Sequence, residues 1–123
     1  MKKKFKLPKD FATKWISALR SGEYKQGLGW LADEDNRYCC LGIAGLLCGI
    51  PKEKMEGIGL FHNFQVRDKF DMNIIPKELI GNNNNDSDYN ELASKLVEMN
   101  DNGDSFFLIA DWIEKNVEFY EET

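Results

Sequence analysis

The sequence predicts an α+β domain with about four helices in one layer around a buried central helix, beside a small antiparallel β-hairpin or sheet. Three observations favour this class. Residues 39–50 are apolar on every side, as in a helix that other elements cover. Two segments nearer the chain ends, 11–19 and 106–117, carry apolar residues at helical spacing. Short extended runs flank a polar turn at 33–36, which is typical of a hairpin.

The first helix is expected to begin after Pro8, with Asp10 as its N-cap, and to end at Gly22. Its apolar face consists of Phe11, Trp15, Ile16 and Leu19. Residues 1–7, which hold four lysines, are expected to be a basic tail. Because 123 residues is near the commonest domain size, residues 1–123 are expected to form a single domain.

The predicted hairpin consists of two extended runs, 24–31 and 37–39, around the turn at 33–36. Gly27 and Gly29 make a helix unfavourable in the first run and indicate a bulge or a close approach of backbone. The sequence therefore predicts two short antiparallel strands just before the central helix.

The central helix is expected to begin at Cys40 or at the next residue and to end at Gly49, because Pro51 follows. Residues 60–66 alternate apolar and polar side chains and predict a third strand. Residues 82–86 are almost all asparagine and predict a loop with too little apolar content to pack.

Two helices close the predicted fold. Residues 88–91 resemble a capping box and begin the first of them. Asp104 or Ser105 is expected to cap the second, whose apolar stripe consists of Phe106, Ile109, Ala110, Ile113 and Val117. Residues 118–123 are expected to be an acidic tail, because negative charge at a helix C-terminus favours fraying.

The net charge of −5 is unevenly distributed, since residues 1–25 hold half of the sixteen Lys and Arg and the rest of the chain is strongly acidic. An acidic body disfavours extended nucleic acid as a partner, because phosphate neutralisation supplies most non-specific affinity. No apolar run is long enough to span a membrane, and no apolar stretch follows the N-terminal lysines as in a signal peptide. We therefore expect a cytoplasmic protein without a membrane partner, and the sequence leaves a homo-oligomer open.

Cys39 and Cys40 are the candidate nucleophiles, because they lie at a predicted strand-to-helix junction where the thiol pKa can be lowered. The only histidine, His62, would then be the general base. The alternative, which we prefer, is that both cysteines pack as small apolar side chains and that the protein is not an enzyme. The cysteines and the histidine match no metal-ligand spacing, and neither a P-loop nor a dinucleotide fingerprint is present, so no metal or cofactor is expected.

A second group of residues fits the recognition of a small nucleotide. Aromatic faces stack on bases, side-chain amides read base edges, and glycines let backbone N–H groups approach phosphate. If the hairpin lies beside the start of the central helix, these groups line one pocket at the helix N-terminus, which attracts anions. The predicted ligand-binding residues are Tyr24, Gln26, Gly27, Gly29, Trp30, Arg37, Cys40, Asn100, Asp101 and Ser105.

Three collinear blocks resemble a family of small phage and prophage proteins. The blocks read W-x-x-A-L-R-S-G-x-Y-x-Q-G-x-G-x-L at 15–31, Y-C-C-L-G at 38–42 and M-N-D-x-G-x-S-F-x-x-I-A-D-W-I-E at 99–114. Members of that family usually continue Cys-Cys-Leu-Gly with Val-Leu-Cys-Asp, whereas this chain has Ile-Ala-Gly-Leu at 43–46, so no role for a following aspartate is carried over. The resemblance implies a phage or prophage context, in the cytoplasm of an infected or lysogenic bacterium, rather than a particular activity.

Small acidic phage proteins are often inhibitors of host defence, and some sequester the nucleotides that defence systems use as signals. By that analogy, the leading hypothesis is a binding protein that sequesters a cyclic nucleotide or an ADP-ribose derivative without turnover. One alternative is a hydrolase or transferase that uses a cysteine nucleophile. A second alternative is a protein-binding inhibitor that covers a host enzyme with its acidic face.

Overall fold

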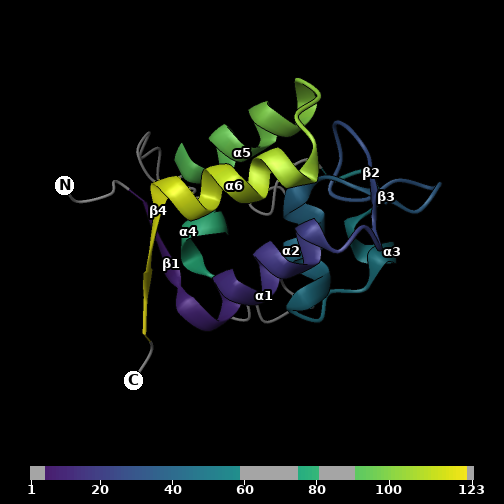
Figure 1. Ribbon diagram of the computed structural model, residues 1–123. Coiled ribbons are helices and arrows are strands. Elements are labelled where there is room, and N and C mark those ends of the chain that lie inside the picture. The colour runs from purple at the N-terminus through teal and green to yellow at the C-terminus, as the bar shows by residue number, and fades with distance from the viewer. Residues whose placement is uncertain (1–4, 59–74, 81–90, 122–123) are drawn as a thin grey trace.

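The computed structural model describes residues 5–58, 75–80 and 91–121 (Figure 1). It is a mixed structure of helices and short strands, as the sequence predicts. Four of the predictions lie outside the described residues: the strand at 60–66, His62, the loop at 82–86 and the start of the capping box at Asp88.

Helix α2 (Cys40–Leu47) is the predicted central helix, and its residues 40–45 are all buried. It packs against helix α1 (Lys9–Arg20), helix α5 (Glu91–Asp101) and the short helix α3 (Lys52–Met55). A Cβ atom at Gly42 would run into the carbonyl oxygen of Leu31. The glycine therefore lets the helix lie directly on the backbone of the preceding segment.

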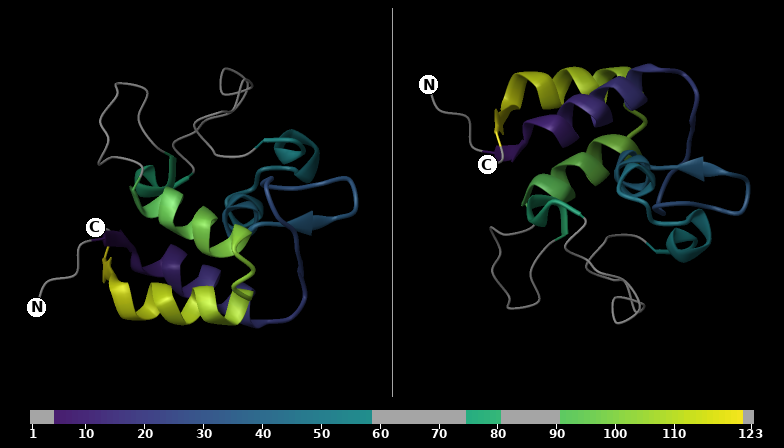
Figure 2. Two further views of the ribbon diagram at one scale, coloured as in Figure 1. Left: turned by 90° about the horizontal axis from the view of Figure 1, so that it is seen from above. Right: turned by 90° about the horizontal axis from the view of Figure 1, so that it is seen from below.

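Helix α1 buries one face and packs along helix α6 (Phe106–Asn116), and Figure 2 shows the two side by side. Pro8 precedes the first turn of α1 without a side-chain cap, so the prediction that Asp10 is the N-cap was wrong. Asp10 lies within the first turn instead, where its negative charge still favours the N-terminal end of the helix dipole. The short helix α4 (Lys77–Ile80) packs against α5.

The predicted antiparallel pairing was wrong, because β2 (Lys25–Gln26) and β3 (Arg37–Tyr38) are parallel. The chain between them reverses twice. It turns back through Gly29, whose φ is +85°, and then turns again at the predicted polar turn, where Ala32 pairs with Tyr38 in an antiparallel bridge. Two reversals restore the original direction, so the flanking strands run parallel.

The terminal segments form a second parallel pair, β1 (Phe5–Pro8) with β4 (Val117–Tyr120). The prediction of tails at 1–7 and 118–123 was therefore wrong for the residues of these strands. Leu7 and Val117 are buried, and Phe5 stacks obliquely on Trp112 with ring centroids 5.9 Å apart. The first three residues of each strand read apolar, charged, apolar, and the charged residues Lys6 and Glu118 are exposed.

Candidate functional site

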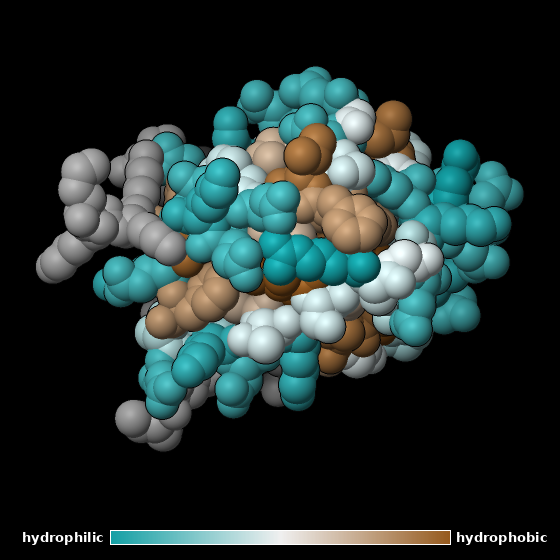
Figure 3. Space-filling model, in the orientation of Figure 1, coloured by the Kyte–Doolittle hydropathy of each residue, from teal (hydrophilic) through white to brown (hydrophobic). Residues whose placement is uncertain are grey.

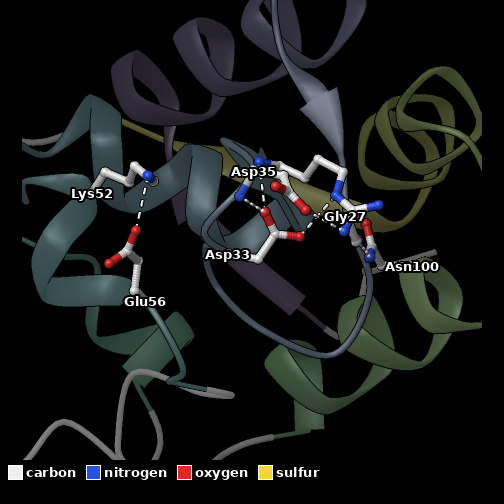
Figure 4. Close-up of polar contacts among 7 residues, drawn as sticks. Gly27, Asp33, Asp35, Lys52, Glu56 and Asn100 are labelled. Atoms are coloured by element: carbon white, nitrogen blue, oxygen red, sulfur yellow. Dashed lines mark hydrogen bonds and ion pairs between the residues drawn. The ribbon is translucent and has the colours of Figure 1, made fainter.

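A buried asparagine joins the two segments that the sequence predicts to meet at the start of the central helix. Asn100, near the end of α5, is fully buried and is the only buried polar residue in the described part of the chain. Its Oδ1 accepts hydrogen bonds from the Gln26 side chain at 2.9 Å and from the backbone N–H of Cys40 at 3.2 Å. Its Nδ2 donates to the carbonyl oxygen of Gly27 at 2.7 Å (Figure 4). We call these four residues the Asn100 network.

Further hydrogen bonds attach the loop after β2 to the turn after α5. The Gln26 side chain also donates to the backbone carbonyl of Asp104 at 2.7 Å. The backbone N–H of Gly29 donates to the Asp101 carboxylate at 2.9 Å. The loop at 26–29 is thus held at both ends, against the turn that leads into α6.

The Asn100 network occupies the place where a nucleotide pocket is predicted. The structure does bring Gln26, Gly27, Cys40 and Asn100 together, and places Gly29 beside Asp101. However, their polar groups bond to one another. The Cys40 N–H, which is the free donor that a phosphate would need, is already bonded to the amide oxygen of Asn100. The first N–H group of α2 is therefore used by an internal hydrogen bond.

The two candidate nucleophiles are buried at the start of α2. Cys39 and Cys40 are at most 2% exposed, and the Cys40 thiol donates a weak hydrogen bond to the carbonyl of Leu96 at 3.6 Å. Burial raises the pKa of Cys39 to about 11 and raises the pKa of Cys40 well above its ordinary value. Both shifts disfavour the thiolate form that a nucleophile needs, and burial is the usual environment of a cysteine that packs as a small apolar side chain.

Two other predicted ligand residues have structural partners. Tyr24 makes an edge-to-face contact with Tyr38, with ring centroids 6.3 Å apart. Ser105 is the N-cap of α6, as predicted, and its hydroxyl accepts from the backbone N–H of Leu108 at 3.2 Å. Both residues stabilise the local fold, and neither lines the surface pocket that contains other predicted residues.

That pocket contains Trp30 and Arg37, has a volume of about 440 Å³, and is here called the Trp30 pocket. Its lining residues are Trp30, Asp33, Glu34, Asp35, Arg37, Glu56 and Gly57. The acidic members are not among the predicted ligand residues, although the run Asp33–Asp35 close to Trp30 in the sequence could have indicated them.

The charges of the Trp30 pocket are partly paired (Figure 4). Nε of Arg37 lies 2.9 Å from the Asp33 carboxylate, and Nη2 lies 3.3 Å from that of Asp35. Burial raises the Asp33 pKa, but the N–H groups and the charge that face the carboxylate outweigh this, so its pKa is below the ordinary value. Lys52 pairs with Glu56 at 2.8 Å. Because carboxylates outnumber cationic groups, the pocket disfavours an anionic ligand.

A second cavity, of about 540 Å³, lies between α1, α6 and β4 and contains none of the predicted site residues. Its lining residues are Thr13, Ile16, Ser17, Arg20, Ser21, Glu114 and Phe119. Arg20 is held there by the carboxylates of Asp111 and Glu114. This cavity has no group that the sequence marks for recognition.

Large apolar side chains are exposed on the segment 28–30 and in the first turn of α6. They are Leu28, Trp30, Phe107 and Leu108, each between 49% and 57% exposed, and we call them the apolar rim. Leu28 and Trp30 lie on the loop, whereas Phe107 and Leu108 lie in the first turn of α6. Figure 3 shows apolar surface on the face that carries α6.

One family model matches residues 7–78, more than half of the chain, and is described as a domain of unknown function, DUF8296. The chain belongs to the DUF8296 family. No curated protein and no solved structure matches it. The DUF8296 match covers the loop, the start of α2 and the whole Trp30 pocket, whereas Asn100 and the α6 half of the apolar rim lie outside it.

No helix among the described residues is long and apolar enough to cross a membrane. Within the same ranges, no group of three or more His, Cys, Asp or Glu side chains converges to hold a metal ion. The carboxylates of the Trp30 pocket therefore do not have the arrangement of a metal site.

Proposed function

We propose that this DUF8296 protein is a non-catalytic binding protein that holds a partner protein on its outer surface. One observation carries the proposal: the four large apolar side chains of the apolar rim are about half exposed, and hydrogen bonds attach the loop that precedes Trp30 to the residues just before α6. Several large apolar side chains exposed on segments held in this way are typical of an interaction site. Exposed aromatic residues such as Trp30 and Phe107 are the usual energetic centres of protein interfaces.

The Asn100 network supports this proposal in two ways. It uses the N–H of Cys40 and the carbonyl of Gly27 in internal bonds, so these two groups are not offered to a ligand. It also fixes the loop that carries Leu28 and Trp30, and a fixed contact surface loses less conformational entropy on binding. The raised pKa of the buried cysteines supports a role without catalysis.

The biological context is part of the proposal. The three sequence blocks support a phage or prophage protein that acts in the cytoplasm of an infected or lysogenic host. A host defence protein is the kind of partner that this context favours. The acidic body of the chain supports association with a partner that carries basic surface.

The test is capture of the partner from host lysate with matched variants. Phe107→Ser and Leu28→Ser should each weaken the captured complex by about tenfold or more, as expected for interface centres. Leu47→Ser is the control, because Leu47 is also exposed but lies at the end of α2, away from the rim. Melting temperatures should stay near that of the wild type in all three variants. Equal capture by rim and control variants would refute the proposal.

Sequestration of a nucleotide is the second candidate. The observation that favours it is that Trp30 and Arg37, two of the predicted ligand residues, line one pocket. A tight ligand at a hundredfold excess over its Kd should stabilise the fold by about 2.7 kcal/mol. Thermal shift with cyclic dinucleotides and ADP-ribose, on the wild type and on Arg37→Ala, tests it. Flat melting curves would remove this candidate.

A further inference from the structure

We infer that the Trp30 pocket holds a lysine or arginine side chain of the partner protein. The inference rests on the proposed function, because it assigns the chemistry of the bound segment. Trp30 belongs both to the apolar rim and to the pocket, so a partner that covers the rim also reaches the pocket. The pocket is a cavity with an aromatic wall, and its charge decides which side chain it takes.

The charge of the pocket favours a cation. Arg37 is bridged by Asp33 and Asp35, so this group of three carries a net negative charge. Glu34 is exposed and has neither a hydrogen bond nor an ion pair to any described residue. An incoming cationic group can pair with Glu34 without displacing another partner, whereas an anion would meet an excess of carboxylates.

The aromatic wall favours an organic cation. A guanidinium or ammonium group is attracted to the face of an indole ring, and Trp30 is 49% exposed. The aliphatic stem of a lysine or arginine can pack on the same ring while its charged head reaches the carboxylates. A metal ion is disfavoured, because the described acidic side chains form no converging ligand group.

The walls of the pocket are fixed by backbone hydrogen bonds. The N–H of Gly57 donates to the carbonyl of Ala32 at 3.3 Å, and the N–H of Leu31 donates to the carbonyl of Ile58 at 2.6 Å. These bonds join the Trp30 segment to the residues after α3 on the opposite wall. The pocket is therefore formed before the partner arrives, and complementary charge can increase the association rate.

The experiment is an NMR titration of the full chain with N-acetyl-arginine amide, and with N-acetyl-citrulline amide as the uncharged isostere. The signals to follow are the indole N–H of Trp30 and the backbone amide of Gly57. Both should shift and saturate with the arginine probe in the millimolar range, and the citrulline probe should bind at least tenfold more weakly. Glu34→Gln should weaken the arginine probe at least threefold. Glu118→Gln, at the exposed position of β4 and not among the residues that line the pocket, should leave the affinity for the arginine probe unchanged.

Three outcomes would overturn the inference. They are equal shifts with both probes, no saturable shift with either, and shifts of the same signals with ADP-ribose but not with arginine. The proposed function fails separately, because its test uses Phe107, which belongs to the rim but not to the pocket. If Phe107→Ser abolishes capture while Glu34→Gln changes neither capture nor titration, the proposed function stands and this inference is wrong. If the arginine titration succeeds while Phe107→Ser keeps capture, the pocket binds a cationic side chain but the proposed docking of a partner on the apolar rim is wrong.

Discussion

Replacement of Asn100 should cause a large loss of stability, because this side chain satisfies two buried backbone groups. In Asn100→Ala the N–H of Cys40 and the carbonyl of Gly27 lose their partner, while Gln26 keeps its bond to Asp104. A buried polar group without a partner costs about 1–3 kcal/mol. Two such groups give an expected loss of about 4 kcal/mol, a large part of the ~5–15 kcal/mol by which a domain is stable. Urea denaturation measures this loss.

Asn100→Asp separates the hydrogen-bond argument from a simple loss of packing. The carboxyl keeps an acceptor for Gln26 and Cys40, but it faces the carbonyl of Gly27 with a second oxygen where the amide donates. Only the protonated carboxyl can donate there, so its pKa in the folded state should be higher than the ~3.9 of an unfolded aspartate. The folded variant then binds more protons than the unfolded one. The free energy of unfolding of Asn100→Asp should therefore lie furthest below that of the wild type at a pH above the folded-state pKa. This difference should become smaller as the pH falls toward 4.

Asn102→Ala is the control, because Asn102 is exposed in the turn that directly follows α5, and it should change stability by less than about 0.5 kcal/mol. A loss below about 1 kcal/mol for Asn100→Ala would refute the claim that Asn100 satisfies two buried backbone groups. A deficit of Asn100→Asp that does not change with pH would refute the assignment of a donated bond to Gly27.

Two other predictions test the close packing of α2. In Gly42→Ala the new Cβ meets the Leu31 carbonyl, so we expect a loss of about 2 kcal/mol or more, where an unhindered helix position would gain up to about 1 kcal/mol from alanine. Gly22→Ala, which has open space but a φ of +78°, should lose only about 1 kcal/mol, and urea midpoints that reverse this order would contradict the contact. For the buried thiols Cys39 and Cys40, iodoacetamide at pH 8 should label neither in the folded protein and both in denaturant. Rapid labelling of either in the folded state would restore the nucleophile hypothesis.

The helices could be predicted because their signals are local. A run that is apolar on every side, closed by Gly49 and Pro51, has no solvated face as a helix and has to lie in the interior. The stripe of α6 and its cap at Ser105 follow from spacing and from one hydroxyl. These features depend on residues within a few positions of one another, so one sequence contains them.

The strand pairing could not be predicted, because it depends on where distant segments lie. Strands of two residues carry almost no periodic signal, and the direction of β2 against β3 depends on a reversal at Gly29 that is fixed by the distant Asp101. In the terminal strands the charges of Lys6 and Glu118 dominated the interpretation, although the residues beside them alternate as in a strand. A tail and an edge strand of this kind differ only in whether a partner is available.

At the candidate site, the sequence does not distinguish a ligand-binding site from an internal hydrogen-bond network. The residues that meet at Asn100 fit a ligand site because amides and glycine backbone groups make hydrogen bonds at short range, and such groups bond equally well to a ligand or to the protein itself. A buried asparagine that caps the start of a helix and one that binds a phosphate through the same geometry have the same sequence signature. Only the observation that every partner of Asn100 is internal distinguishes them.

The hydrogen bonds of the interior network also order the loop that carries part of the exposed apolar rim. A loop with glycines at 27 and 29 has high conformational entropy when it is free, and a binding surface on such a loop would lose much of its affinity in becoming ordered. The bonds to Asn100 and Asp101 order that loop during folding, before any partner is present. The residues that resemble a ligand site are thus the ones that make a surface site effective. They position Leu28 and Trp30, and through the turn they connect these two residues to the start of α6.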